Sequence, residues 1–230
     1  MIQNKKEFGL GLVLIAVFFL VLFAIFSPLF EGGRNSLDYL DSTFNSISKD
    51  SAYYIPAVME KARKHEGTEV AINLNAADAG QAARMGKLLS SSAGATVTVD
   101  AGKLSVSGDF GRILGVVLAD ADLMFRNEGA AVAAKYGFDE RRVLYDWHQA
   151  LSAMTKDLNR QGKFKEAKML REVQTKAIEP AYNYYGIQAV PMTSMIWIAM
   201  AALVGYVVYT VWYGFAILFL FEGWGIRLKH

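Results

Sequence analysis

The side chains of this sequence that could carry out acid–base chemistry stand in the stretch "YDWHQ". It places Asp146 two residues before His148, and a histidine next to a carboxylate is a common arrangement for a general base. The surrounding pattern is helical, however, and side chains two positions apart on a helix do not face each other. We therefore expect no catalytic pair here and predict that His148 is solvated or partly packed.

A second candidate is "LADADLM", where the carboxylates of Asp120 and Asp122 could hold a divalent metal ion. These residues are also two apart in a helical segment, and no nucleotide-binding motif is near them. Other ligands are scarce, because the three histidines are far apart and the sequence has no cysteine. Without cysteine the chain has no disulfide, thiolate metal site or cysteine nucleophile. We predict no catalytic residue, no metal and no cofactor.

The charged residues are concentrated in the middle of the chain and balance one another. Residues 31–189 contain 20 Lys and Arg and 20 Asp and Glu. A nucleic-acid-binding surface needs an excess of basic residues on one face or along one stripe. The neutral middle segment therefore argues against nucleic acid as a partner.

Two long segments near the ends of the chain contain no charged residue. They are residues 9–30, "GLGLVLIAVFFLVLFAIFSPLF", and residues 190–221. A helix needs about 20 apolar residues to cross a bilayer. A cleaved signal peptide fits residues 9–30 less well, because its apolar part has about 7–15 residues and ends at a small-x-small site. We predict a transmembrane helix in each segment.

The basic residues next to the two spans predict their orientation. Lys5 and Lys6 precede the first span, and Arg227 and Lys229 follow the second. Short loops and tails that carry Lys and Arg stay in the cytoplasm. We therefore place both tails in the cytoplasm of a bacterium, the spans in its inner membrane and the middle of the chain in the periplasm. The cytoplasmic tails are residues 1–8 and 222–230. The transmembrane helices are residues 9–30 and 190–221, and the periplasmic domain is residues 31–189.

The second span carries residues that predict packing against another helix. Tyr206, Tyr209 and Tyr213 recur at helical spacing, and a phenol hydroxyl in hydrocarbon needs a hydrogen-bond partner. Small residues four positions apart allow a second helix to approach closely. The partner is either another subunit or the first span of the same chain. The small pairs are Ala201 with Gly205 and Thr210 with Gly214.

A second candidate contact surface lies where the chain leaves the first span. In "SKDSAYYIPAV", Tyr53, Tyr54 and Ile55 are bulky side chains in a polar stretch. They either pack onto the periplasmic domain or form a contact surface for another subunit.

Within the periplasmic segment, residues 68–136 have the pattern β-α-β-β-α. "TEVAINLN" alternates apolar and polar residues like a half-buried strand, and "ATVTVDAGKLSVSG" is typical of a hairpin. The order resembles half of a ferredoxin-like fold that lacks a clear final strand. This is a resemblance of topology, which many unrelated functions share.

Residues 139–179 are predicted to form a helical hairpin with one apolar stripe on each helix. The turn "RQGKFKEA" resembles the turn within a tetratricopeptide repeat. Only one such hairpin is visible, and about three repeats are needed for a stable array. The two stripes are Leu144, Trp147, Leu151, Met154 and Leu158, then Phe164, Ala167, Leu170, Val173 and Ala177.

These features predict an α+β membrane protein in which two transmembrane helices flank an extracytoplasmic domain. Our leading hypothesis is a non-catalytic membrane subunit that contacts the lipid bilayer and binds other membrane subunits or copies of itself. The alternative is a periplasmic ligand-sensing receptor, although tails of about nine residues leave no room for an output domain. A membrane-anchored enzyme is the third hypothesis, and the lack of a catalytic constellation disfavours it.

Overall fold

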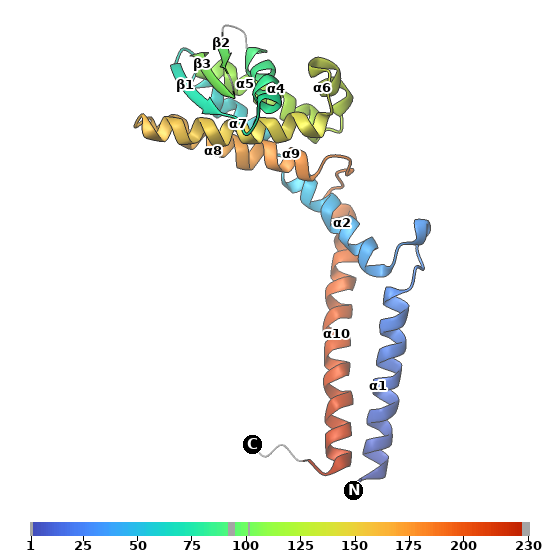
Figure 1. Cartoon of the computed structure of the whole chain (residues 1–230). Helices are drawn as coiled ribbons and strands as arrows, with labels where there is room; N and C mark the ends of the chain where they lie inside the picture. The colour runs from blue at the N-terminus through green and yellow to red at the C-terminus, as the bar shows by residue number, and fades with distance from the viewer. Residues whose placement is uncertain (1, 92–94, 101, 227–230) are drawn as a thin grey trace. The chain divides into compact units, whose positions relative to one another are not determined.

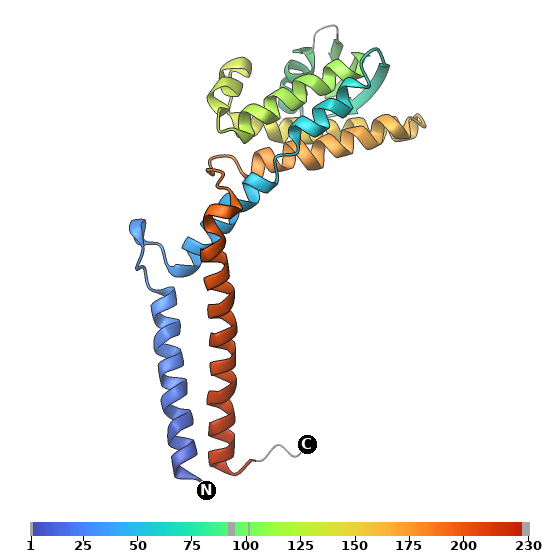
Figure 2. The same ribbon diagram turned by 180° about the vertical axis from the view of Figure 1, so that it is seen from behind.

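The computed structural model describes residues 2–91, 95–100 and 102–226, which fold into two compact units (Figures 1 and 2). One unit combines residues 1–50 with residues 189–230, and the other consists of residues 51–188. The predicted cytoplasmic anchors Arg227 and Lys229 lie outside the described residues.

The first unit is built on two apolar helices, α1 (Lys5–Phe26) and α10 (Met192–Trp224), which are long and apolar enough to cross a membrane. The side-chain carbonyl of Asn4 accepts the first free N–H groups of α1, and Pro28 follows its end. Helix α10 stops at Gly225, whose φ of 87° suits glycine. Its 33 residues make it about 50 Å long at ~1.5 Å per residue.

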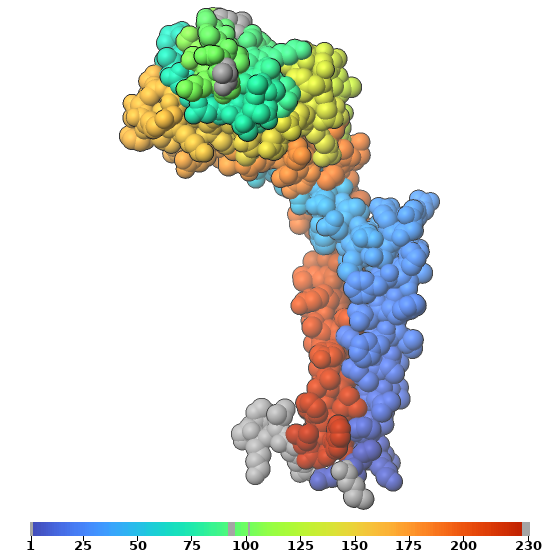
Figure 3. All heavy atoms as spheres, in the orientation of Figure 1, coloured from blue at the N-terminus to red at the C-terminus, as the bar shows by residue number. Residues whose placement is uncertain are grey.

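Helices α1 and α10 lie side by side and antiparallel, and their side chains are in contact (Figures 1 and 3). At one end, the N–H groups of Gln3 and Asn4 donate to the carbonyl of Gly223. Toward the other end, α10 continues beyond the end of α1 (Figures 1 and 2). The chain between them passes through a short 3₁₀ turn, η1 (Glu31–Gly33), into α2 (Ser36–Ser51).

The second unit contains a three-stranded antiparallel sheet of β1 (Glu69–Asn75), β2 (Thr96–Asp100) and β3 (Lys103–Asp109). The spatial order is β1-β3-β2, so the hairpin strand β3 lies between the parallel strands β1 and β2. With α4 (Ala79–Ser90) and α5 (Phe110–Phe125), the chain order is β-α-β-β-α, as predicted. This is a split β-α-β arrangement.

A helix takes the place of a fourth strand at the outer edge of β1. Helix α7 (Glu140–Arg160) packs along this edge, and the Asp157 carboxylate accepts the N–H of Asn73 at 3.0 Å. The Gln161 side chain donates to the carbonyl of Ala71 at 2.8 Å. Side chains thereby satisfy two backbone groups at the outer edge of β1, and no fourth strand occurs in the described part of the chain.

Period-2 alternation divides the sheet into an apolar and a polar face. The apolar face of β1 and β3 is buried under the helices, while the other face is exposed and rich in Ser, Thr and Asn. The unit is completed by α3 (Ile55–Arg63), α6 (Gly129–Tyr136), α8 (Phe164–Val173), the π-helical segment η2 (Gln174–Ile178) and α9 (Glu179–Asn183).

Helices α7 and α8 form the expected hairpin, which turns at Gly162 with φ of 74°. The apolar stripe of α7 is fully buried, and so are Ala167, Leu170, Val173 and Ala177 on the returning segment. Phe164 is a correction to the predicted stripe, because its side chain is 67% exposed. It is the first residue of α8 and stands at the turn, where α7 does not cover it.

Candidate interaction face and polar groove

Two of the three predicted tyrosines of α10 contact α1, and within the described residues the third makes no ring contact with it. Tyr209 donates its hydroxyl to the carbonyl of Phe18 at 3.1 Å, and the two rings stack with centroids 4.3 Å apart. The Tyr213 ring also contacts this phenylalanine, with centroids 5.1 Å apart. Helix α1 therefore supplies the partner of Tyr209. Tyr206 is 68% exposed and makes no ring contact with α1 among the described residues.

The predicted small residues lie away from α1. Ala201 and Thr210 are exposed, and Thr210 donates its hydroxyl to the Tyr206 carbonyl within α10. A Cβ added at Gly205 or at Gly214 would have no atom within 4 Å. These four residues are uncovered in this chain, but they lie on two opposite sides of α10, because the nine residues from Gly205 to Gly214 make about 2.5 helical turns. Their role in binding a partner stays a prediction.

The two helices instead approach most closely at glycines that the sequence analysis did not select. A Cβ on Gly11 would stand 2.7 Å from the backbone nitrogen of Leu220 and 3.1 Å from the carbonyl oxygen of Ala216. A Cβ on Gly223 would collide with the backbone of Phe8. The small-residue spacing concerns pairs within one helix, whereas Gly11 and Gly223 belong to different helices.

Two residues of the Tyr53–Tyr54–Ile55 segment, Tyr53 and Ile55, pack within the second unit. The Tyr53 hydroxyl donates to Asp122 at 2.6 Å, and its ring stacks on Phe125 at 5.1 Å. Ile55 is 1% exposed and belongs to the core, so it cannot form a contact surface, which corrects that part of the prediction. Tyr54 is exposed and stays a candidate contact residue.

Asp120 is a buried hydrogen-bond acceptor, although its sequence context allowed a metal ligand. One oxygen accepts the Tyr136 hydroxyl at 2.5 Å and the Trp147 Nε1–H at 2.9 Å. The other oxygen accepts the Lys135 ammonium at 2.7 Å. Burial, followed by the bond to Asp120, raises the pKa of Tyr136, so this phenol stays protonated. Asp120 therefore holds three polar groups together within the fold.

The remaining acidic and histidine candidates also have separate partners. Asp122 is paired with Arg126, while Asp146 is buried and accepts the Arg84 guanidinium at 2.6 Å. His148 lies 2.6 Å from the amide nitrogen of Gln174, away from these carboxylates. No cluster of three or more His, Cys, Asp or Glu side chains suited to a metal occurs within the described residues.

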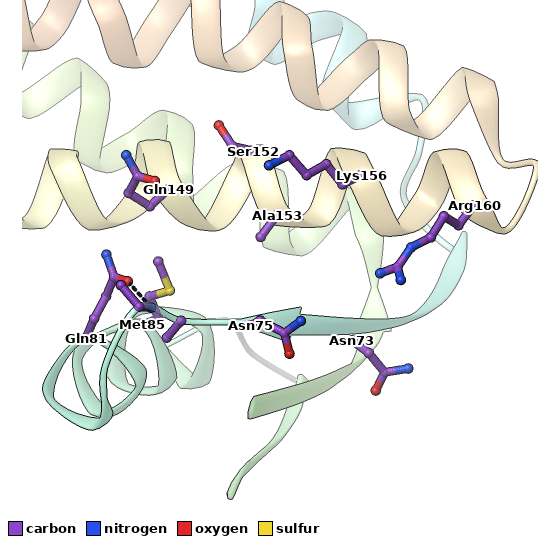
Figure 4. A pocket seen from close by; sticks show the side chains of 11 residues that line it. Asn73, Asn75, Gln81, Met85, Gln149, Ser152, Ala153, Lys156 and Arg160 are labelled. Carbon is purple, nitrogen blue, oxygen red and sulfur yellow. Dashed lines mark hydrogen bonds between the residues drawn. The ribbon is translucent and has the colours of Figure 1, made fainter. Parts of the chain in front are cut away.

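A polar groove opens between strand β1 and helix α7, with a volume of about 350 Å³ (Figure 4). The residues of α7 form one wall, and the end of β1 with the start of α4 forms the other. The lining has seven polar side chains and an apolar remainder of Met85 and three alanines. The polar side chains are Asn73, Asn75, Gln81, Gln149, Ser152, Lys156 and Arg160.

A smaller hollow of about 250 Å³ lies between α7 and α9 and shares Gln149 with the groove. It contains Tyr145, His148, Glu179 and Tyr182. His148 Nε2 lies 3.5 Å from the Glu179 carboxylate. The π-helical segment supplies Gln174, whose side chain also donates to Ser152 at 3.0 Å. Sequence spacing cannot reveal this pairing, because Glu179 comes from a different helix.

No protein-family model matches this chain, and no curated protein or solved structure is significantly similar to it.

Proposed function

We propose that this protein is a non-catalytic membrane subunit. Helices α1 and α10 cross the inner membrane of a bacterium, both termini lie in the cytoplasm and residues 31–189 form a periplasmic domain. The basic residues Lys5 and Lys6 beside α1 support this orientation. The domain and α10 bind other membrane subunits or further copies of the same chain.

The observation that carries this proposal is that two glycines of α10 are uncovered in this chain. Gly205 and Gly214 have no neighbour within 4 Å of an added Cβ, whereas Gly11 and Gly223 already serve the α1–α10 contact. Helices in lipid associate through close packing of small residues, because the hydrocarbon removes the hydrophobic force between them. The uncovered glycines thus offer close-packing positions on two opposite sides of α10 that the chain does not use itself.

The test introduces leucine substitutions into the full-length protein and extracts each variant in mild detergent. Native mass spectrometry then compares how much intact complex is recovered. Gly205→Leu and Gly214→Leu should reduce the recovery of the intact complex while the monomer keeps its fold. Val204→Leu is the matched control on an exposed neighbouring position and should have no effect. Gly11→Leu should instead disturb the contact with α1, because there is no room for its side chain.

Two results would contradict the proposal. One is a wild-type protein that appears only as a bare monomer under gentle extraction. The other is assembly of both the Gly205→Leu and Gly214→Leu variants at the wild-type level. The mass of the complex separates self-association from binding of a different subunit.

A ligand-sensing receptor is the second candidate function, and the polar groove beside α7 is the observation that favours it. Its size falls at the lower end of the range of about 300–1,000 Å³ that is common for small-molecule sites. A receptor of this kind would pass its signal to a separate partner, so the two candidates share the need for another subunit. A membrane-anchored enzyme stays the third candidate.

A further inference from the structure

We propose that the groove between β1 and α7 binds a small di- or hydroxycarboxylate. The inference concerns residues 73–160 of the second unit alone and does not depend on the proposed membrane topology.

The lining carries two positive charges and no carboxylate. Arg160 donates to Asp157 at 2.9 Å, and the other oxygen of Asp157 is occupied by Asn73 N–H and Gln161. Lys156 has no hydrogen-bond or ion-pair partner within the described part of the chain. Its charge is therefore not neutralised locally, which favours a negatively charged ligand.

The polar side chains of the groove offer mostly donors. Gln81 already uses its side-chain oxygen to accept the Ala77 N–H at 2.8 Å, which leaves its amide N–H groups available. Ser152 accepts a hydrogen bond from Gln174, so its own hydroxyl proton is free to donate. The side-chain amides of Asn75 and Gln149 have no hydrogen-bond partner within the described residues. An acceptor-rich ligand satisfies such a set.

The N-terminus of α4 does not provide the anion site. The Asp78 side chain accepts the Gln81 N–H, and the Gln81 side chain accepts the Ala77 N–H, so two of these backbone donors are already bound. Recognition therefore depends on side chains, which suits a carboxylate better than a phosphate cradled by backbone N–H groups.

The remaining lining selects among carboxylates. Met85, Ala76, Ala77 and Ala153 supply the apolar part of the lining, which can pack against a short carbon chain. A free amino acid fits less well, because its ammonium group would meet Lys156 and Arg160 with no lining carboxylate to pair with.

Binding is measured by calorimetry and thermal shift on the full-length protein in detergent. Succinate, malate and citrate should bind and raise the melting temperature, while aspartate and inorganic phosphate should bind at least about tenfold more weakly. Lys156→Gln should weaken binding of the best carboxylate by about tenfold or more. Lys165→Gln, an exposed lysine outside the groove, is the matched control and should bind like wild type.

Each alternative result overturns the proposal in a defined way. Equal binding of phosphate and dicarboxylates would mean a general anion site. Binding of an acidic peptide, with no binding of the free acids, would mean a protein-docking groove. An absence of binding at about 10 mM ligand, or an unchanged affinity in Lys156→Gln, would remove the small-molecule site altogether.

Discussion

At the scale of the residue, the same aspartate can indicate a metal or a packing role, and its neighbours in space decide between them. Asp120 collects a phenol, an indole and an ammonium group from Tyr136, Trp147 and Lys135. Asp122, two positions later, points to the surface and joins Tyr53 to Arg126. The two carboxylates bond to different side chains among the described residues, and residues two apart on a helix point in different directions.

Replacing Asp120 should therefore destabilise the second unit strongly. Asp120→Ala leaves the buried Trp147 N–H without an acceptor, the Lys135 ammonium without its carboxylate and the Tyr136 hydroxyl with Ser91 Oγ alone, so we expect a loss of about 3–5 kcal/mol in the free energy of unfolding. Asp122→Ala is the matched control and should cost about 1 kcal/mol, because its partners stay in contact with water. Denaturant unfolding followed by tryptophan fluorescence measures both. Equal losses would contradict the assigned role of Asp120.

Asp109 should make the stability of the second unit depend on acid pH. The Gly67 N–H donates to its carboxylate at 2.7 Å, and this bond, with that from Arg112 N–H, holds the pKa of Asp109 below its ordinary value. A lowered pKa in the folded state adds stability above the ordinary aspartate pKa of about 3.9, and that stability is lost as the pH falls through the lower, folded-state value. Asp109→Asn should flatten the acid limb of the melting temperature. An unchanged acid limb would mean that this carboxylate does not contribute.

At the scale of the element, local patterns predicted most of the helices and strands, whereas contacts between elements were not predictable. The alternation in "TEVAINLN" and the hairpin signal around Gly102 led to β1, β2 and β3. The replacement of a fourth strand by α7 depends on Asp157 and Gln161, which lie 84 and 90 residues from their partners on β1. No periodic pattern records such a contact.

The candidate site was predictable to a smaller extent than the fold. Tyr209 was correctly expected to need a partner, but the partner, Phe18, could not be read from α10 alone. The groove was missed because its polar residues are separate surface positions until β1, α4 and α7 come together. Gly11 was missed because its close contact lies on the other helix.

The helical hairpin provides a direct test of the corrected stripe. Phe164→Ala should change the free energy of unfolding by less than about 0.5 kcal/mol, because the ring is mostly in solvent. Leu170→Ala removes a fully buried side chain from the same helix and should cost about 2–5 kcal/mol. Thermal and denaturant unfolding of the two variants decide the point. A loss of several kcal/mol in the free energy of unfolding of Phe164→Ala would mean that Phe164 is buried, as the sequence pattern predicted.

At the scale of the whole molecule, the apolar helices differ in length by an amount that matters for a bilayer. Helix α1 has 22 residues and α10 has 33, about 33 and 50 Å long at ~1.5 Å per residue. The start of α1 and the end of α10 lie at the same level, because the Gln3 N–H donates to the Gly223 carbonyl. The excess of α10 therefore lies at its first turns, where Trp197 is almost fully exposed. An exposed tryptophan there suits the boundary between lipid and water.

The proposed orientation can be tested with single cysteines, because the native sequence contains none. Gln188→Cys should react with a membrane-impermeant maleimide in intact spheroplasts, as expected for a periplasmic residue. Ile2→Cys should react only after the cells are opened. Reaction of Ile2→Cys in intact spheroplasts would overturn the two-span topology, and protection of Gln188→Cys in the folded protein is checked by labelling after denaturation.

The helix that closes the edge of β1 also sets an order of events for a growing chain. A ribosome delivers β1 first and the residues that satisfy its edge, Asp157 and Gln161, more than 80 residues later. Until then, the unpaired N–H and C=O groups of β1 can pair with any extended strand nearby. A nascent or truncated chain that lacks α7 is therefore expected to be prone to aggregation, and the interval before α7 arrives is when the chain most needs a chaperone.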